Sequence, residues 1–505
     1  MKSWKKAISL ALSAVTALCF CACGDGGATG PTEVASGYAR YDLGEALSAT
    51  TVGMGAQIDT DVYMPWNNLT PEEEAMLEQR IIDMNLQYTR IKFFPEFFER
   101  ANDNSDPNTF DYTAAGVDFE SVEMQALYKI LDICEEQHIN VDLSWYGCYA
   151  WFDSYDGQYD GTWMGYTKEE LPNAWVTAPR AGNYEEYAEN ISVMLDYLIN
   201  TKGYTCIYGF SVIAEMFIDD KGVISFAAYA DCCRIVDERL KTDGLRDKVR
   251  FIGTSNSANV VRYYEEEQLA VKDYFDVGGI GNYNWENSDN LESAYNYFFD
   301  IMDVVDKYNW EGMIISEFCQ GKHFINAVDK TDIDDYEAGL YIARFMIAAT
   351  NNGVTGFDHY ILGDTWFTDS YVHTMGLWQY RNADWKAHPE YYFWGLICKY
   401  TDIGSKIYPI QMVNDEIMMV AFELPDGSWS YMIANNATQT KRVAVVNNNV
   451  NKPKSLNAYK ITESLIPEDR ACVLPEAYTT VDSSGGIAHV SLPAKSFTVL
   501  SSKAA

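Results

Sequence analysis

The segment MIISEFCQG, residues 313–321, decides the fold. Its apolar residues lead through Ser316 to a carboxylate, Glu317, at the point where a buried strand would end. Burying an unpaired carboxylate costs free energy, so a carboxylate at this place needs a partner or a chemical role. The segment therefore predicts a buried strand whose C-terminal end emerges at a functional site.

Seven other short apolar runs resemble this strand, and helical stretches with apolar 3–4 spacing lie between them. Alternating strands and helices are typical of a parallel sheet, and apolar runs in such strands indicate burial on both faces. Eight units in about 350 residues predict a (β/α)8 TIM barrel over residues 46–403. The expected strands are residues 50–56, 88–94, 140–147, 207–215, 249–255, 276–284, 312–318 and 354–362.

The sequence pattern changes after residue 403, from alternating strands and helices to strands alone. Residues 404–505 contain short strands without helical patterns between them, and a PDG turn at residues 425–427 indicates a hairpin. This pattern predicts a small C-terminal all-β sandwich packed against the barrel.

The N-terminal residues are typical of a targeting segment. A basic start and an apolar run of signal-peptide length occupy residues 1–22, and small polar residues predict a flexible tether at 23–45. The junction resembles a bacterial lipobox with Cys23 as the acylated residue, and Cys21 fits less well. We expect a protein that is lipid-anchored through Cys23 at the extracellular face of the bacterial membrane; an ordinary cleaved signal peptide and secretion are the alternative.

Composition excludes several classes of partner. The formal net charge of the 505 residues is −36, which argues against nucleic acid and polyanionic substrates and is compatible with a neutral one. The cysteines show neither CxxC pairs nor zinc-site spacing, and no phosphate-loop or dinucleotide motif follows a strand. The sequence therefore predicts neither a metal site nor a cofactor.

Residues at the C-terminal ends of barrel strands face the active site. Glu215 on the fourth strand and Glu317 on the seventh stand nearly opposite each other in a barrel of eight strands. Two facing carboxylates are what glycoside hydrolysis requires: one protonates the leaving oxygen, and the other attacks the anomeric carbon or activates water. The other strand-end candidates for substrate binding are Arg90, Asn256, Tyr283, His359 and Trp366.

This arrangement over residues 51–401 resembles the clan A glycoside hydrolases, which are retaining (β/α)8 enzymes. The resemblance implies that Glu215 is the acid/base and that Glu317 is the nucleophile. It also implies that Arg90 lies beside the nucleophile, that the Tyr283 hydroxyl binds it, and that Trp366 supports the sugar. Trp378 competes with Trp366 for that last role.

One residue departs from the family pattern. The clan has asparagine immediately before the acid/base, where this chain has Ala214. Asn256 and Asn282 are candidates to replace it. The alternative is a non-catalytic surface glycan-binding lipoprotein on the same barrel, and a solute-binding lipoprotein of a transporter is a third interpretation.

The stretch 145–175 is rich in tryptophan and tyrosine, whose flat rings stack on sugar faces. Trp145 and Trp151 lie nearest the strand end and are the predicted substrate contacts, unless the loop packs on its own aromatic residues. The overall prediction is a hydrolase of β-glycosidic bonds in a neutral poly- or oligosaccharide. The sequence does not decide the glycan, endo or exo action, or the oligomeric state.

Overall fold

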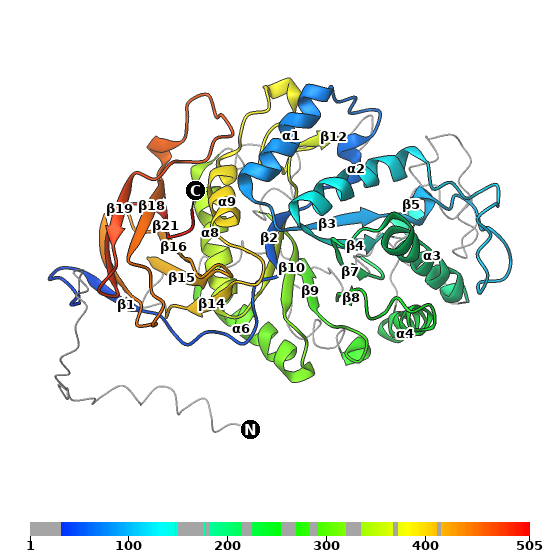
Figure 1. Cartoon of the computed structure of the whole chain (residues 1–505), viewed down its shortest axis with the longest axis horizontal. Helices are drawn as coiled ribbons and strands as arrows, with labels where there is room; N and C mark the ends of the chain where they lie inside the picture. The colour runs from blue at the N-terminus through cyan, green and yellow to red at the C-terminus, as the bar shows by residue number, and fades with distance from the viewer. Residues whose placement is uncertain are drawn as a thin grey trace.

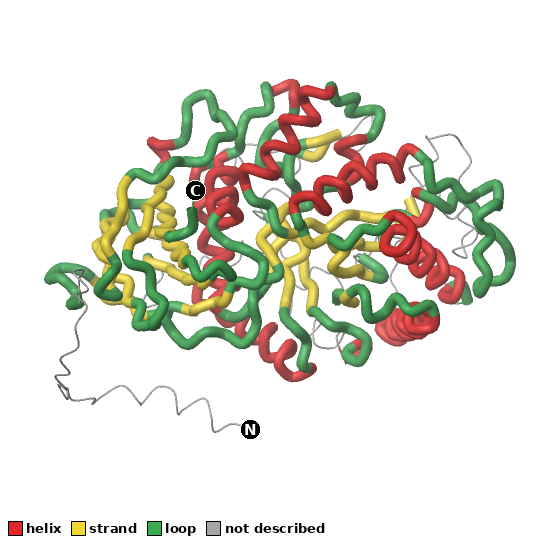
Figure 2. Tube along the Cα trace, viewed as in Figure 1, coloured by secondary structure: helices red, strands yellow, loops and turns green. Residues whose placement is uncertain are grey.

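A computed structural model describes residues 32–146, 148–149, 175–176, 179, 182–214, 225–253, 269–281, 291–319, 335–366, 372–411 and 416–504. Figure 1 shows two bodies side by side, a barrel on the right and a β-rich body on the left. Figure 2 separates their strands, in yellow, from the helices that lie between and around them.

The barrel confirms the predicted (β/α)8 fold. Eight parallel strands follow the order β8-β7-β4-β3-β2-β11-β10-β9, and each lies within one of the predicted runs. A parallel bridge between Ile252 and Val277 connects the two end strands, so the sheet closes on itself. The strands are β2 (Gly53–Ala56), β3 (Tyr88–Phe93), β4 (Asn140–Trp145), β7 (Ile207–Ser211), β8 (Arg250–Phe251), β9 (Gly278–Gly281), β10 (Met313–Phe318) and β11 (Gly356–His359).

Helices connect successive strands and cover the barrel from outside (Figure 1). The first begins with a complete capping box: the Thr70 hydroxyl accepts from the Glu73 backbone N–H while the Glu73 carboxylate accepts from the Thr70 N–H, and Pro71 occupies the first turn. The helices are α1 (Pro71–Met84), α2 (Val122–Gln137), α3 (Tyr184–Asp196) with its π-helical extension η6 (Tyr197–Lys202), α4 (Phe226–Thr242), α6 (Leu291–Tyr308), α8 (Tyr336–Asn351) and α9 (Pro389–Lys399).

Short elements decorate the connections. They are the 3-10 turns η2 (Thr60–Tyr63), η3 (Pro95–Phe97), η8 (Arg381–Ala383) and η9 (Glu463–Leu465), and the paired strands β5 (Cys148–Tyr149) with β6 (Trp175–Val176) and β12 (Thr365–Trp366) with β13 (Val372–His373).

Side chains fill one end of the barrel. Tyr88, Ile252, Val277 and Ile314 come from four different parts of the wall and form one buried cluster. Space is so limited that a Cβ on Gly55 would lie 1.7 Å from the Tyr88 carbonyl oxygen. This end of the barrel is therefore a packed core, which leaves the other end for a candidate site.

The C-terminal body is a β-sandwich, as predicted. One sheet has the order β1-β17-β20 and the other β14-β15-β16-β21-β18-β19. The larger sheet is buried on both faces, since Met418 and Val420 pack toward the barrel helices while Met419 packs toward the smaller sheet. Its strands are β14 (Lys406–Pro409), β15 (Ile417–Glu423), β16 (Trp429–Asn435), β18 (Ser455–Ile461), β19 (Thr479–Asp482) and β21 (Ser496–Ser501).

The smaller sheet revises the predicted tether. It contains β1 (Ala39–Asp42), β17 (Lys441–Val446) and β20 (Ile487–Leu492). Strand β1 pairs in parallel with β17, so part of the segment 23–45 belongs to the sandwich. The sequence of β1 resembles a linker because its residues are small or charged, apart from Tyr41, which is the only one of the four that is buried.

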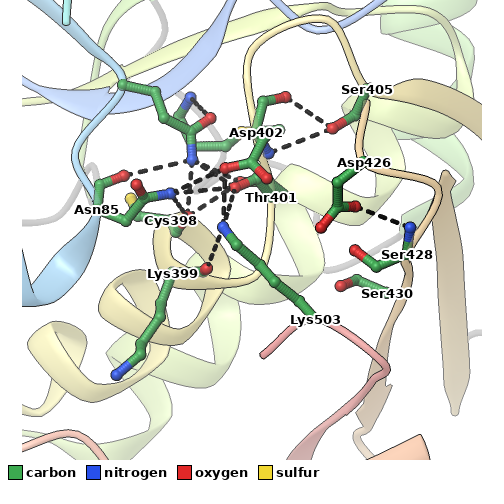
Figure 3. Close-up of polar contacts among 12 residues, drawn as sticks. Asn85, Cys398, Lys399, Thr401, Asp402, Ser405, Asp426, Ser428, Ser430 and Lys503 are labelled. Carbon is green, nitrogen blue, oxygen red and sulfur yellow. Dashed lines mark hydrogen bonds and ion pairs between the residues drawn. The ribbon is translucent and has the colours of Figure 1, made fainter. Parts of the chain in front are cut away.

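The C-terminal tail fastens the sandwich to the barrel (Figure 3). The Lys503 ammonium lies 2.7 Å from an Asp402 carboxylate oxygen and donates to the carbonyls of Lys399 and Thr401. The Asn85 amide donates to the same Thr401 carbonyl, which links the end of α1 to this contact. The far end of the chain thus ties the last barrel helix to the sandwich.

The predicted signal segment and Cys23 lie outside the described residues. In the part of the chain that the structure describes, no helix is both long and apolar enough to cross a bilayer.

Candidate active site

Glu317 lies at the C-terminal end of β10, with 3% of its surface exposed. Ile314 points into the barrel cluster, and Ile315 belongs to the outer core. A register shift between Ile315 and Glu317 then changes the alternation, so that the carboxylate also points inward. The irregular pairing of β10 is therefore what directs Glu317 into the barrel.

Arg90 is the charge partner of Glu317. Its Nη1 lies 3.3 Å from Glu317 Oε2, and both side chains are buried. The guanidinium also donates to the Ser144 hydroxyl at 2.8 Å, to the Tyr146 hydroxyl at 2.8 Å and to the Ser316 carbonyl at 3.4 Å. These contacts from β4 and β10 fix the plane of the guanidinium, which in turn holds one oxygen of Glu317.

Lys92, two residues after Arg90 on β3, is a second buried cation that faces inward. Lys92 Nζ lies 3.8 Å from Asp59 Oδ2 and donates to the Tyr360 hydroxyl at 3.1 Å. The Gln57 amide donates to both oxygens of Asp59, at 2.8 and 2.9 Å. The inward face of β3 thus presents two positive charges to the mouth of the barrel.

Two further carboxyl groups lie beneath this pair. Burial raises the pKa of Asp142 to about 6, and the Arg90 charge and the Tyr88 and Ser211 hydroxyls act against that rise. Burial also raises the pKa of Asp358 well above its usual range, again opposed by Arg90. Arg90 therefore interacts with several carboxyl groups at once.

Trp145 does not face the site, which corrects the prediction that it binds substrate. Its ring is fully buried against Phe93, and its indole N–H donates to Asn190 on α3 at 3.1 Å. Alternation along β4 points Asp142, Ser144 and then Tyr146 inward, and Trp145 outward. Tyr146, the next residue along the chain, is the aromatic residue at the end of this strand that faces the site.

His359 is corrected for the same reason. It is fully buried; its Nδ1–H donates to the Ile361 carbonyl, and its Nε2 lies 3.0 Å from a Glu390 oxygen on α9. The inward residue of β11 is its neighbour Asp358. His359 therefore binds the strand to the helix layer and is not available to a substrate.

Trp366 lies in the β12–β13 hairpin and is partly exposed. Its carbonyl accepts from the Trp66 indole N–H and the Asn67 amide, both at 3.0 Å. Trp378, its predicted competitor, is buried under the Arg80 guanidinium. Trp366 is thus the more accessible of the two rings.

Glu215, Trp151, Asn256 and Tyr283 lie outside the described residues, so their predicted roles stay predictions. Ala214, which precedes Glu215, is buried, and its backbone N–H donates to the Trp145 carbonyl at the end of β4. Cys319 is also buried and packs with Tyr360 and Ile361, as a residue with a packing role would.

Sequence reasoning missed Tyr146, Asp358 and the Lys92–Asp59 pair. The sequence did contain a signal: along β3, β4 and β11, every second residue faces inward, in phase with Arg90. Polar residues at every second position of otherwise apolar strands mark the inward face.

Comparisons with known proteins bear on the fold. No protein-family model and no curated protein matches the chain. Solved structures do match: a glycoside hydrolase family 30 endoxylanase from Clostridium papyrosolvens aligns with TM-score 0.63 and 13% identity, covering 92% of this chain and 99% of that one. An endo-β1,6-glucanase aligns with TM-score 0.62 and 16% identity, covering 94% and 96%.

A glycoside hydrolase family 51 arabinofuranosidase from Xanthomonas axonopodis pv. citri aligns with TM-score 0.56 and 13% identity, covering 92% of this chain and 99% of that one. The protein therefore has the fold of these glycoside hydrolases: a (β/α)8 barrel joined to a β-sandwich.

Proposed function

We propose that the protein is a retaining glycoside hydrolase that cleaves β-glycosidic bonds in a neutral poly- or oligosaccharide. The observation that carries the proposal is Glu317, a buried carboxylate at the end of the seventh barrel strand with Arg90 3.3 Å away. A nucleophilic carboxylate must stay ionised, and a fixed positive charge at this distance favours the ionised form. The neighbouring xylanase and glucanase folds favour a β-glycan as substrate.

In the proposed reaction, Glu317 attacks the anomeric carbon and the leaving oxygen takes a proton from Glu215. A glycosyl ester then forms on Glu317, which removes its charge. Glu215, now ionised, takes a proton from water as the water attacks the same carbon, and the ester bond breaks to release Glu317 as a carboxylate. Arg90 holds Glu317 Oε2 throughout, which limits the carboxylate to one orientation.

The experiment is a panel of β-glucans, xylans and mannans tested with wild-type protein, Glu317→Gln and Glu215→Gln. We expect Glu317→Gln to abolish turnover and Glu215→Gln to lower it about 10²–10⁴-fold, since an acid/base group contributes that much. Glu311→Gln is the matched control, because that carboxylate is exposed and lies just before β10.

Stereochemistry gives an independent readout. Proton NMR of the first product should show the same anomer as the substrate. Near-normal turnover by Glu317→Gln, or an inverted product, would contradict the mechanism.

Ala214 favours a second candidate, a surface glycan-binding protein without catalysis. Alanine offers no hydrogen bond to a sugar hydroxyl at a position where the resembling hydrolases carry asparagine. Binding of a glycan without release of reducing ends would support this candidate. In either case we propose a lipid anchor at Cys23 on the extracellular face of the membrane.

A further inference from the structure

Three acidic side chains converge outside the proposed active site. Glu99 follows η3, Asp103 lies in the loop before α2, and Glu186 lies in the first turn of α3. Each brings one carboxylate oxygen within 4.8 Å of the others. The loop and α3 lie together at the right-hand end of the molecule in Figure 1.

Among the described residues, Glu99 and Asp103 each have one carboxylate oxygen without a hydrogen-bond partner. Glu99 is only 2% exposed; its Oε2 accepts from the Asn190 amide at 2.8 Å, but its Oε1 is buried without a hydrogen-bond partner among the described residues. Asp103 is similar: its Oδ2 accepts from the Asn104 amide and the Asp111 N–H, while its Oδ1 is buried and unpartnered there. Two unsatisfied oxygens thus belong to one small group.

A further buried carboxylate nearby adds to the uncompensated negative charge. Glu189, one helical turn after Glu186, is 1% exposed, and its nearest ion pair is Arg239 at 3.5 Å. Arg239 makes closer contacts elsewhere, at 2.6 Å to Asp243 and 2.6 Å to the Pro107 carbonyl. Arg239 is therefore shared among Asp243, Glu189 and, at longer range, Glu186, and it satisfies the two glutamates poorly.

The electrostatic consequence is consistent with this geometry. Burial, with the Glu186 and Asp103 charges, raises the pKa of Glu99 to about 8, against the effect of the Asn190 amide. Burial and the Asp103 charge raise the pKa of Glu186 to about 7. Burial and the charges of Asp103 and Glu186 raise the pKa of Glu189 to about 7. A cation among these groups would relieve the repulsion.

We propose that Glu99, Asp103 and Glu186 form a calcium-binding site. The donors are all carboxylate oxygens, which hard cations prefer, and sequence motifs gave no sign of it because the ligands come from two separate segments. Oxygens on opposite sides of Ca²⁺ are about 5 Å apart, so three carboxylate oxygens within 4.8 Å of one another can share one ion. Water would complete the coordination, since Asp103 is partly exposed.

The site would join the loop after β3 to helix α3. Asn190 connects it to the barrel, because its amide nitrogen donates to Glu99 and its amide oxygen accepts from the Trp145 indole. Strands β3 and β4 supply Arg90 and Tyr146 to the mouth of the barrel. Calcium at this site would therefore stabilise the end of the barrel that carries the proposed chemistry, whether or not the protein is a hydrolase.

The test uses the full mature chain, with CaCl2 as the probe after treatment with EDTA. Thermal unfolding and isothermal titration calorimetry are measured for wild type, Glu186→Gln and Glu99→Gln. Glu185→Gln is the control, because Glu185 is exposed in the same helical turn. At a calcium concentration a hundredfold above the dissociation constant, wild type and control should gain about 3 °C.

The two site variants should lose one calcium per chain in calorimetry and gain correspondingly less on heating. In EDTA at about pH 9, where both carboxyl groups are ionised, they should unfold at or above the wild-type temperature, because each then removes a buried negative charge. The proposal is overturned if calcium does not bind the wild type, or if both site variants bind and respond to calcium as the wild type does.

Discussion

Replacing Arg90 with methionine is the most informative perturbation of the barrel. Methionine keeps an unbranched apolar stem, though a shorter one, and removes the charge and all the donors. The guanidinium now touches Glu317 at 3.3 Å and donates to Ser144 and Tyr146 at 2.8 Å each. All of these groups are buried, so water does not replace what is lost.

The magnitude follows from what remains. Glu317 would be left 3% exposed and Asp142 fully buried, both without their nearest cation. Removing one partner of a buried ion pair costs about 3–5 kcal/mol, because the other charge stays in a site of low dielectric constant. We expect Arg90→Met to lower the free energy of unfolding by that amount.

Guanidinium chloride unfolding at pH 7, followed by far-UV circular dichroism and by tryptophan fluorescence, measures the effect. Arg250→Met is the matched control, since Arg250 is also an arginine on a barrel strand but pairs with Glu311 where both side chains are about half exposed. Exposed pairs contribute about 0–1 kcal/mol, so the control should stay close to wild type. If Arg90→Met loses no more than Arg250→Met, the buried pair does not carry the stability assigned to it.

Two further predictions concern pH and location. The folded pKa of Asp142, about 6, lies above its ordinary value, so folded protein binds the extra proton, and stability falls as pH rises from about 4 to about 6. Asp142→Asn should therefore raise the free energy of unfolding by up to about 3 kcal/mol over wild type above pH 6 and leave it unchanged below pH 4. Denaturant unfolding at four pH values measures this difference. A difference between variant and wild type that does not change with pH would refute the prediction. Cys23→Ala should move the protein from the membrane fraction to the soluble fraction, whereas an ordinary signal peptide would leave the distribution unchanged.

The barrel could be predicted from sequence because its strands and helices differ in period and length. Each of the eight strands falls in a short apolar run, and the connecting helices carry their own start signals, such as Thr70 and Glu73 at the start of α1. Strand β1 was missed because it has four residues, of which one is buried, and its partner β17 is some 400 residues away. Local pattern carries little information about such a strand.

The site was predicted less completely, because apolar strands buried on both faces do not reveal which side chains face inward. Arg90 and Glu317 could be found, since a charge in an apolar strand must face the polar end of the barrel. Trp145 and His359 were chosen for their chemistry, yet each stands one position out of phase with the inward face. A register shift in β10 also interrupts the alternation of inward and outward side chains, and no residue type in that strand predicts the shift.

The choice of arginine at position 90 and lysine at position 92 follows from the directions of their partners. Lys92 serves chiefly Asp59, which Gln57 also binds, and a point charge is enough for that task. Arg90 must reach β4 on one side and β10 on the other at the same time, and only a planar group with several donors spans both. The guanidinium thus connects the strand that carries Ser144 to the strand that carries Glu317. This makes the position of the proposed nucleophile a property of the barrel wall as a whole.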